Sequence, residues 1–163
     1  MKASARLRYV LPFLLVLIFP QVLLAAGSVI PAADNLAEVG RSSQEQHIPT
    51  VVFVSRDACP YCRTLRETIL KPMFTADKFE NRAILVEISL NRVEPLTGFE
   101  NQQITATAFG QLYQAEITPT LLFLDSEGRE IAKRIVGISN LELYGFYLQR
   151  SIDEALETIR TGS

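Results

Sequence analysis

Histidine and cysteine, the residues that most often bind transition metals, are scarce in this chain of 163 residues. The sequence has one histidine, His47, and two cysteines, Cys59 and Cys62. A structural zinc ion takes four ligands, and these three residues cannot complete such a set. We therefore expect no metal site, and we interpret His47 as a surface residue that precedes a strand.

Clustered positive charge is also lacking beyond the first few residues. The basic residues Lys2, Arg6 and Arg8 stand near the N-terminus, and no run of lysine or arginine follows them. Because phosphate binding requires a basic face, the sequence disfavours nucleic acid as a partner. The chain has 18 acidic and 16 basic residues, and none of the acidic ones lies in residues 1–28, so the remainder is net acidic.

Residues 1–28 have the layout of a secretory signal peptide. An apolar run at 10–24 follows the three basic residues, and the small residues 25–28 follow the apolar run. We expect cleavage near residues 25–28 and a periplasmic location. An uncleaved membrane anchor is the alternative, but Pro12, Pro20 and the short apolar run argue against it, because a full span needs about 20 apolar residues.

Local patterns after the leader predict one α/β domain. The segment "PTVVFVS" at 49–55 is apolar and β-branched, which is typical of a strand buried on both faces. Thr105 is placed to cap a helix, and Pro72 is expected to end or kink one. The order of elements predicts helices around a mixed central sheet. We expect helices over 35–46, 60–70, 76–81, 105–113 and 141–161, strands over 49–55, 83–90, 120–125 and 129–137, a flexible lead over 29–34 and a loop over 91–103.

The two cysteines stand three residues apart in "DACPYC", between a buried strand and a helix. A disulfide between them closes almost no loop, so its entropic contribution to stability is small, and the pair is better suited to redox turnover. Cys59 opens the helix, where unpaired N–H groups favour a thiolate, so we expect a lowered pKa and a nucleophilic role for Cys59. Cys62 is the expected resolving thiol. An inert bridge is the alternative.

These motifs resemble those of thioredoxin-fold proteins. The resemblance rests on "VVFVSRDACPYC" followed in order by "ITPTLLFLDSEGREIAKRIVG", and it covers roughly residues 45–160. Together with the leader, it divides the chain into a signal peptide (1–28), a lead with a short helix (29–47) and a thioredoxin-like domain (48–161). It also implies that Pro119 is cis and lies against the cysteines, and that Tyr61, Thr118 and Pro119 contact the substrate, with the backbone of Thr118 pairing an extended segment.

The subgroup that the chain most resembles is the exported bacterial thioredoxin-like proteins of the disulfide reductase and isomerase type. "CPYC" is also typical of glutaredoxins, but the signal peptide and Thr118 point to the exported group. The resemblance implies a monomeric reductase of protein disulfides that needs no bound cofactor and receives electrons from a membrane thiol-transfer protein. An isomerase or oxidase is the first alternative, and a copper carrier that uses Cys59 and Cys62 is an alternative from another class.

The sequence departs from typical thioredoxins at two positions beside the motif. Phe53 stands where thioredoxins have a buried aspartate, and Ala58 stands where they have a tryptophan. Cys62 must still gain and lose a proton in each cycle, so we considered Glu87, a lone carboxyl in the strand at 83–90, as a proton relay. The alternative is that Glu87 lies near a strand end or pairs with an arginine at the surface.

Overall fold

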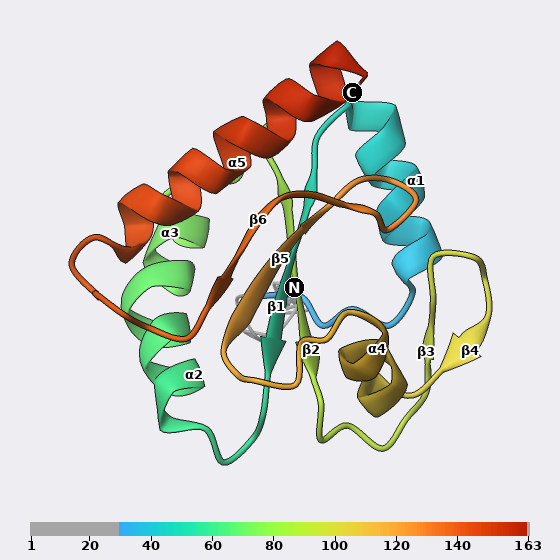
Figure 1. Cartoon of the computed structure of the whole chain (residues 1–163), viewed down its shortest axis with the longest axis horizontal. Coiled ribbons are helices and arrows are strands. Elements are labelled where there is room, and N and C mark those ends of the chain that lie inside the picture. The colour runs from blue at the N-terminus through green and yellow to red at the C-terminus, as the bar shows by residue number, and fades with distance from the viewer. Residues whose placement is uncertain (1–29, 163) are drawn as a thin grey trace, which may run out of the picture.

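The computed structural model of the chain describes residues 30–162, which form a mixed sheet with helices on both faces (Figure 1). The sheet order is β2-β1-β5-β6, and a separate pair of short strands, β3 and β4, lies outside it. The helices are α1 (Leu36–Gln46), α2 (Pro60–Leu65), the π-helix η1 (Arg66–Leu70), α3 (Lys71–Thr75), α4 (Ala106–Leu112) and α5 (Tyr144–Thr161). The strands are β1 (Thr50–Ser55), β2 (Ile84–Ser89), β3 (Leu96–Thr97), β4 (Gln103–Ile104), β5 (Thr120–Leu124) and β6 (Glu130–Val136).

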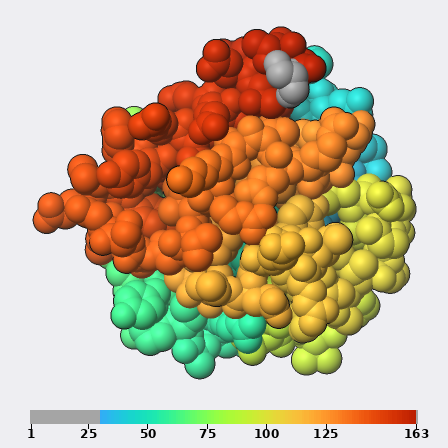
Figure 2. Space-filling model, viewed as in Figure 1, coloured from blue at the N-terminus to red at the C-terminus, as the bar shows by residue number. Residues whose placement is uncertain are grey.

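Strand β1 lies in the middle of the molecule and leads directly to the cysteines. It pairs parallel with β2 and antiparallel with β5, and all six of its residues are buried. Alternate β1 side chains enter two cores. One core lies under α2, η1 and α5 and includes Phe53 and Cys62, and the other lies under α1 and α4 and includes Val52 and Val54. The expected α/β fold with a mixed sheet is confirmed. Figure 2 shows the side of the molecule where β6 lies between α5 and α4.

The helix after the cysteines does not end at Pro72, which was one of the two outcomes expected there. The chain stays helical through this proline, because η1 widens the helix just before it and Lys71 N–H donates to the carbonyl of Arg66. A proline lacks the N–H of a regular turn, and the wider π turn removes the need for that bond. The helix expected over 76–81 was wrong: this stretch is a series of turns, with Asp77 and Asn81 at positive φ.

Residues 30–34, before α1, form an ordered edge of the sheet, which corrects the flexible lead expected over 29–34 for all but residue 29, which lies outside the described residues. Ala33 N–H donates to the carbonyl of Glu87, and Glu87 N–H donates to the carbonyl of Pro31, both at 2.8 Å. Ile30 and Ala33 are each 1% exposed. This segment therefore covers the open edge of β2, which would otherwise expose unpaired backbone groups. The expected signal peptide at 1–28 lies outside the described residues.

No helix within residues 30–162 is both long and apolar enough to cross a membrane. The stretch 91–103 contains β3 and the first residue of β4, although the sequence suggested only a loop. These two-residue strands pair with each other and are too short to give a periodic pattern.

Helix α4 holds the turn between β5 and β6 through Tyr113. Thr105 caps the helix as expected, with Ala108 N–H donating to its hydroxyl at 3.1 Å. At the other end the Tyr113 hydroxyl donates to the carbonyl of Gly128 at 2.8 Å. Burial, together with the nearby carboxylates of Asp125 and Glu130, raises the pKa of Tyr113 to about 12. The phenol of Tyr113 is therefore protonated at neutral pH and can donate this hydrogen bond.

We expect Tyr113→Phe to destabilise the protein by about 1 kcal/mol at neutral pH, because the carbonyl of Gly128 loses its donor. The folded-state pKa lies above the unfolded value of about 10, so the contribution of the phenol is full below pH 10 and is lost as the pH rises toward 12. Urea unfolding of both proteins from pH 7 to 11 measures this. A difference that grows above pH 10 would contradict the assignment.

Candidate active site

The two cysteines stand at the junction of β1 and α2, as the sequence predicted. Cys59 is the N-cap of α2, and Cys62 N–H donates to Cys59 Sγ at 3.0 Å. Pro60 occupies the first helical position, where its missing N–H costs nothing. Cys59 and Cys62 form a disulfide, with their Cα atoms 5.2 Å apart. When the bridge opens, the same N–H and the start of the helix are placed to stabilise a thiolate on Cys59.

The two sulfur-bearing residues differ in their access to solvent. Cys62 is fully buried in the core under α2 and α5, whereas Cys59 is partly exposed. Tyr61, between them in sequence, is 66% exposed on the first turn of α2. A large substrate can therefore reach the sulfur of Cys59 but not that of Cys62. The roles of nucleophile and resolving thiol, and the substrate role of Tyr61, stay predictions.

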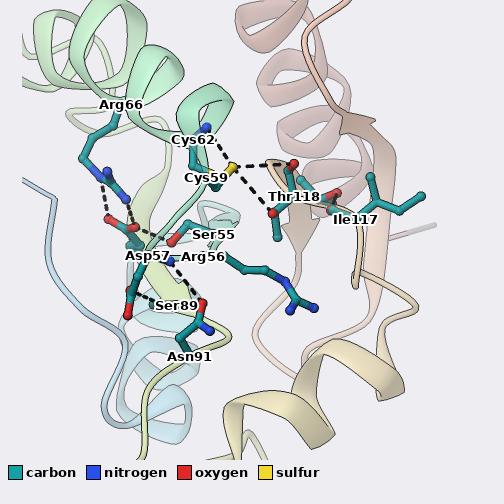
Figure 3. Close-up of a disulfide and its surroundings, with 12 residues drawn as sticks. Ser55, Arg56, Asp57, Cys59, Cys62, Arg66, Ser89, Asn91, Ile117 and Thr118 are labelled. Atoms are coloured by element: carbon teal, nitrogen blue, oxygen red, sulfur yellow. Dashed lines mark hydrogen bonds and ion pairs between the residues drawn. A yellow bond between two sulfur atoms is a disulfide. The ribbon is translucent and has the colours of Figure 1, made fainter.

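The segment 117–119 forms the opposite wall of the site (Figure 3). Cys59 Sγ lies 3.8 Å from the carbonyl oxygen of Thr118 and 3.7 Å from its hydroxyl. The Thr118–Pro119 peptide bond is cis, and Pro119 is buried with its carbonyl accepting from Gly137 N–H at 2.8 Å. Thr118 is thus beside the accessible sulfur, and Ile117 next to it is 68% exposed.

Polar contacts fix the loop that joins β1 to α2 (Figure 3). Asp57 N–H donates to the side-chain oxygen of Asn91 at 3.1 Å, and Ser89 donates its hydroxyl to the Asp57 carboxylate at 2.9 Å. On the other side, the Arg56 guanidinium donates to the carbonyl of Glu116 at 3.4 Å. The loop before Cys59 is therefore bound to both segments that flank it.

Glu87 has an arginine partner, Arg66, which follows Cys62 by one helical turn. The guanidinium of Arg66 donates to both carboxylate oxygens of Glu87, through Nε at 3.1 Å and through Nη2. Ser55 donates its hydroxyl to the same carboxylate at 2.5 Å. The side chains of Arg66 and Glu87 are only 24% and 13% exposed. The alternative that Glu87 pairs with an arginine is therefore confirmed, but the pair is largely buried and does not lie at the surface.

Arg66 is a residue that sequence reasoning missed. Its guanidinium lies 5.3 Å from the centre of the Phe53 ring, and Phe53 is the cross-strand neighbour of Glu87. The hydrogen bond that Arg66 donates to the Glu87 carboxylate is the largest of the effects that raise the pKa of Arg66 above its ordinary value. Arg66 comes four residues after Cys62, one helical turn further on the same face, and this spacing could have identified it. Whether Glu87 relays protons to Cys62 stays a prediction.

His47 is not part of the site around Cys59 and Cys62. It is exposed and ends α1 in a left-handed conformation. Within residues 30–162, no three His, Cys, Asp or Glu side chains are grouped so that they could hold a metal ion.

Comparisons with known proteins place the fold. The family model described as "Thioredoxin-like domain" matches residues 37–149. No curated protein sequence matches the chain significantly. Among solved structures, the DsbH oxidoreductase is similar at 16% identity and a TM-score of 0.54, over 95% of each chain.

Two further solved structures give the same picture. A thioredoxin-fold protein from Helicobacter pylori is 14% identical, with a TM-score of 0.52, over 85% of this chain and 97% of its own. The thioredoxin of Fasciola hepatica is 15% identical, with a TM-score of 0.51, over 77% of this chain and 99% of its own. At these identities the structural similarity speaks for the fold, and the family assignment rests on the matched residues 37–149.

Proposed function

Because the chain belongs to the thioredoxin-like family and carries a disulfide-forming Cys59–Cys62 pair, it is a thiol–disulfide oxidoreductase, and we propose that it is an exported reductase of protein disulfides. The observation that carries the proposal is the unequal access of the two sulfurs. Cys59 is partly exposed beside Thr118, while Cys62 is fully buried behind it. In this arrangement Cys59 can attack a disulfide of a large substrate, and Cys62 can attack only the mixed disulfide that forms on Cys59.

The reaction moves two electrons from the dithiol to the substrate. The Cys59 thiolate attacks one sulfur of the substrate disulfide, so that a mixed disulfide forms and the other substrate sulfur leaves as a thiolate that takes up a proton. Cys62 then loses its proton and attacks Cys59 Sγ. The second substrate thiol is released, and the Cys59–Cys62 disulfide remains. A new cycle requires an external dithiol, and we propose a membrane thiol-transfer protein as this donor.

The direction of electron flow and the location are inferred from Thr118 and from residues 1–28. Thr118 before Pro119 supports a reductase or isomerase over a strong oxidase, by its resemblance to the exported reductases. The layout of residues 1–28 supports export to the periplasm. The covered edge of β2 removes one site at which copies could pair, which supports a monomer.

The reduction potential of the Cys59–Cys62 couple tests the direction. We expect a value near that of thioredoxins, about −270 mV, and we expect the protein to accelerate insulin reduction by dithiothreitol. Equilibration with glutathione buffers, followed by mass spectrometry of the alkylated protein, gives the potential. A value near −120 mV would make the protein an oxidase, and tight binding of one Cu(I) without insulin reduction would make it a copper carrier.

A further inference from the structure

Arg56 is a cation at the mouth of the site without an acidic partner. Within the part of the chain that the structure describes, its guanidinium makes one hydrogen bond, at 3.4 Å to the backbone carbonyl of Glu116, and has no carboxylate within ion-pair distance. Six other arginines of residues 30–162 are ion-paired: Arg41, Arg66, Arg82, Arg92, Arg129 and Arg134. Arg56 is exposed, so most of its five N–H donors are available to a ligand.

Two acidic residues adjoin Arg56, Asp57 in sequence and Glu116 through its backbone carbonyl, and within residues 30–162 neither forms an ion pair with it. The carboxylate of Asp57 accepts the hydroxyl of Ser89 at 2.9 Å. The side chain of Glu116 lies against α4, because its Cγ is within 3.9 Å of the position that a Cβ on Gly110 would take. The charge of Arg56 therefore remains unneutralised at short range.

Arg56 contacts the segment that leads to Thr118 and the site. Figure 3 shows its side chain extending from the end of β1 to a place below Thr118 and Ile117 in this view. The carbonyl that it contacts belongs to Glu116, two residues before Thr118, and the carbonyl oxygen of Thr118 is 3.8 Å from Cys59 Sγ. Two residues of chain span at most about 7 Å. In an extended segment paired with Thr118, the position opposite Glu116 is two residues from the position opposite Thr118, which lies beside Cys59.

We propose that Arg56 is a specificity-determining residue that selects disulfide substrates with a carboxylate within two residues of the cysteine that Cys59 attacks. This inference rests on the proposed reduction of protein disulfides. A guanidinium pairs with a carboxylate through two parallel hydrogen bonds, and the bond to the carbonyl of Glu116 holds it in position beforehand. The ligand is the aspartate or glutamate side chain of an extended polypeptide.

Single turnovers of the reduced protein with matched peptides test the proposal. The peptides share one sequence with an intramolecular disulfide and carry Asp, Asn or Lys two residues before or after the attacked cysteine. We expect the second-order rate constant to be about fivefold higher for the better Asp peptide than for its Asn counterpart, the size of one modest ion pair. This preference should shrink in 0.5 M salt, because the pair forms near solvent. Arg56→Gln should abolish it.

Arg63→Gln is the matched control, because Arg63 is an exposed arginine next to Cys62 that makes no ion pair within residues 30–162. It should keep the wild-type preference. The proposal is overturned if wild type does not distinguish Asp from Asn, or if both variants lose the preference equally. It is also overturned if Arg56→Gln shifts the pH profile of Cys59 alkylation, since Arg56 would then act on the thiolate.

Two more outcomes separate the sources of failure. Oxidised glutathione also carries carboxylates, and an equal loss of its reduction in Arg56→Gln would assign Arg56 to a small disulfide and overturn the polypeptide ligand. If no peptide is reduced by any of the proteins, the proposed reductase function fails, and this inference fails with it. Equal reduction of all the peptides overturns the role of Arg56 alone.

Discussion

Cys62→Ser should convert the protein into a trap that stays covalently attached to its substrates. Cys59 remains partly exposed and keeps the N-cap position of α2, so attack on a substrate disulfide still occurs. The mixed disulfide then persists, because the buried side chain at position 62 no longer carries the sulfur that resolves it. Insulin reduction should fall to the background rate. Non-reducing electrophoresis and mass spectrometry should show a mixed disulfide at Cys59.

Cys59→Ser is the matched control for this experiment. It removes the accessible sulfur and leaves a fully buried one, so it should trap no substrate and have no activity. The reduced wild-type protein should also lose Cys59 to alkylation at mildly acidic pH long before Cys62. Trapping by Cys59→Ser, or equal alkylation of the two thiols, would reverse or remove the assigned roles.

The parts of the fold that could be predicted from the sequence are those with strong local signals. Strand β1 is apolar from Val51 to Val54, and it is buried on both faces as that pattern indicates. The helix cap at Thr105 and the apolar face of α5 can likewise be recognised from local sequence, because each depends on residues a few positions apart. The position of Cys59 at the start of a helix follows from the same local order of strand, motif and helix.

The features that could not be predicted depend on contacts between distant segments. Residues 31 and 33 have no strand pattern, and their pairing with Glu87 becomes visible only when β2 is in place. The π turn at 66–70 reflects how the helix fits around Pro72 and the core, which no propensity describes. Arg66 could be placed on the face of Cys62 by spacing, but its partner, Glu87, is on strand β2, which is distant in sequence.

The replacement of an aspartate by Phe53 changes how charge is arranged below the cysteines. Phe53 is completely buried in the same core as Cys62 and has no ionisable group. The carboxyl of this region is instead on the neighbouring strand at Glu87, the cross-strand partner of Phe53. Arg66 links the two, because it binds Glu87 and lies over the Phe53 ring. The helix that carries Cys62 is thus tied to β2 one turn below the cysteine.

Glu87→Gln should weaken both this link and, if the relay operates, the second half of the reaction. The amide keeps the shape of the carboxylate but removes the charge that Arg66 needs, and Arg66 and Glu87 are only 24% and 13% exposed. We therefore expect a loss of about 1–3 kcal/mol in the free energy of unfolding, measured in urea. Glu67→Gln is the control, because Glu67 is 50% exposed and pairs with Lys71 four residues on, a contact worth about 0.3–0.5 kcal/mol.

The relay itself requires a kinetic measurement that stability does not affect. Single turnovers with the reduced protein separate attack by Cys59 from resolution by Cys62. A proton relay through Glu87 predicts that Glu87→Gln slows resolution and changes its pH dependence between pH 5 and 9, while the attack by Cys59 is unaltered. Glu67→Gln should change neither step. If Glu87→Gln lowers stability but leaves the pH profile of resolution unchanged, Glu87 only anchors Arg66, and the proton of Cys62 must leave through another group or through water.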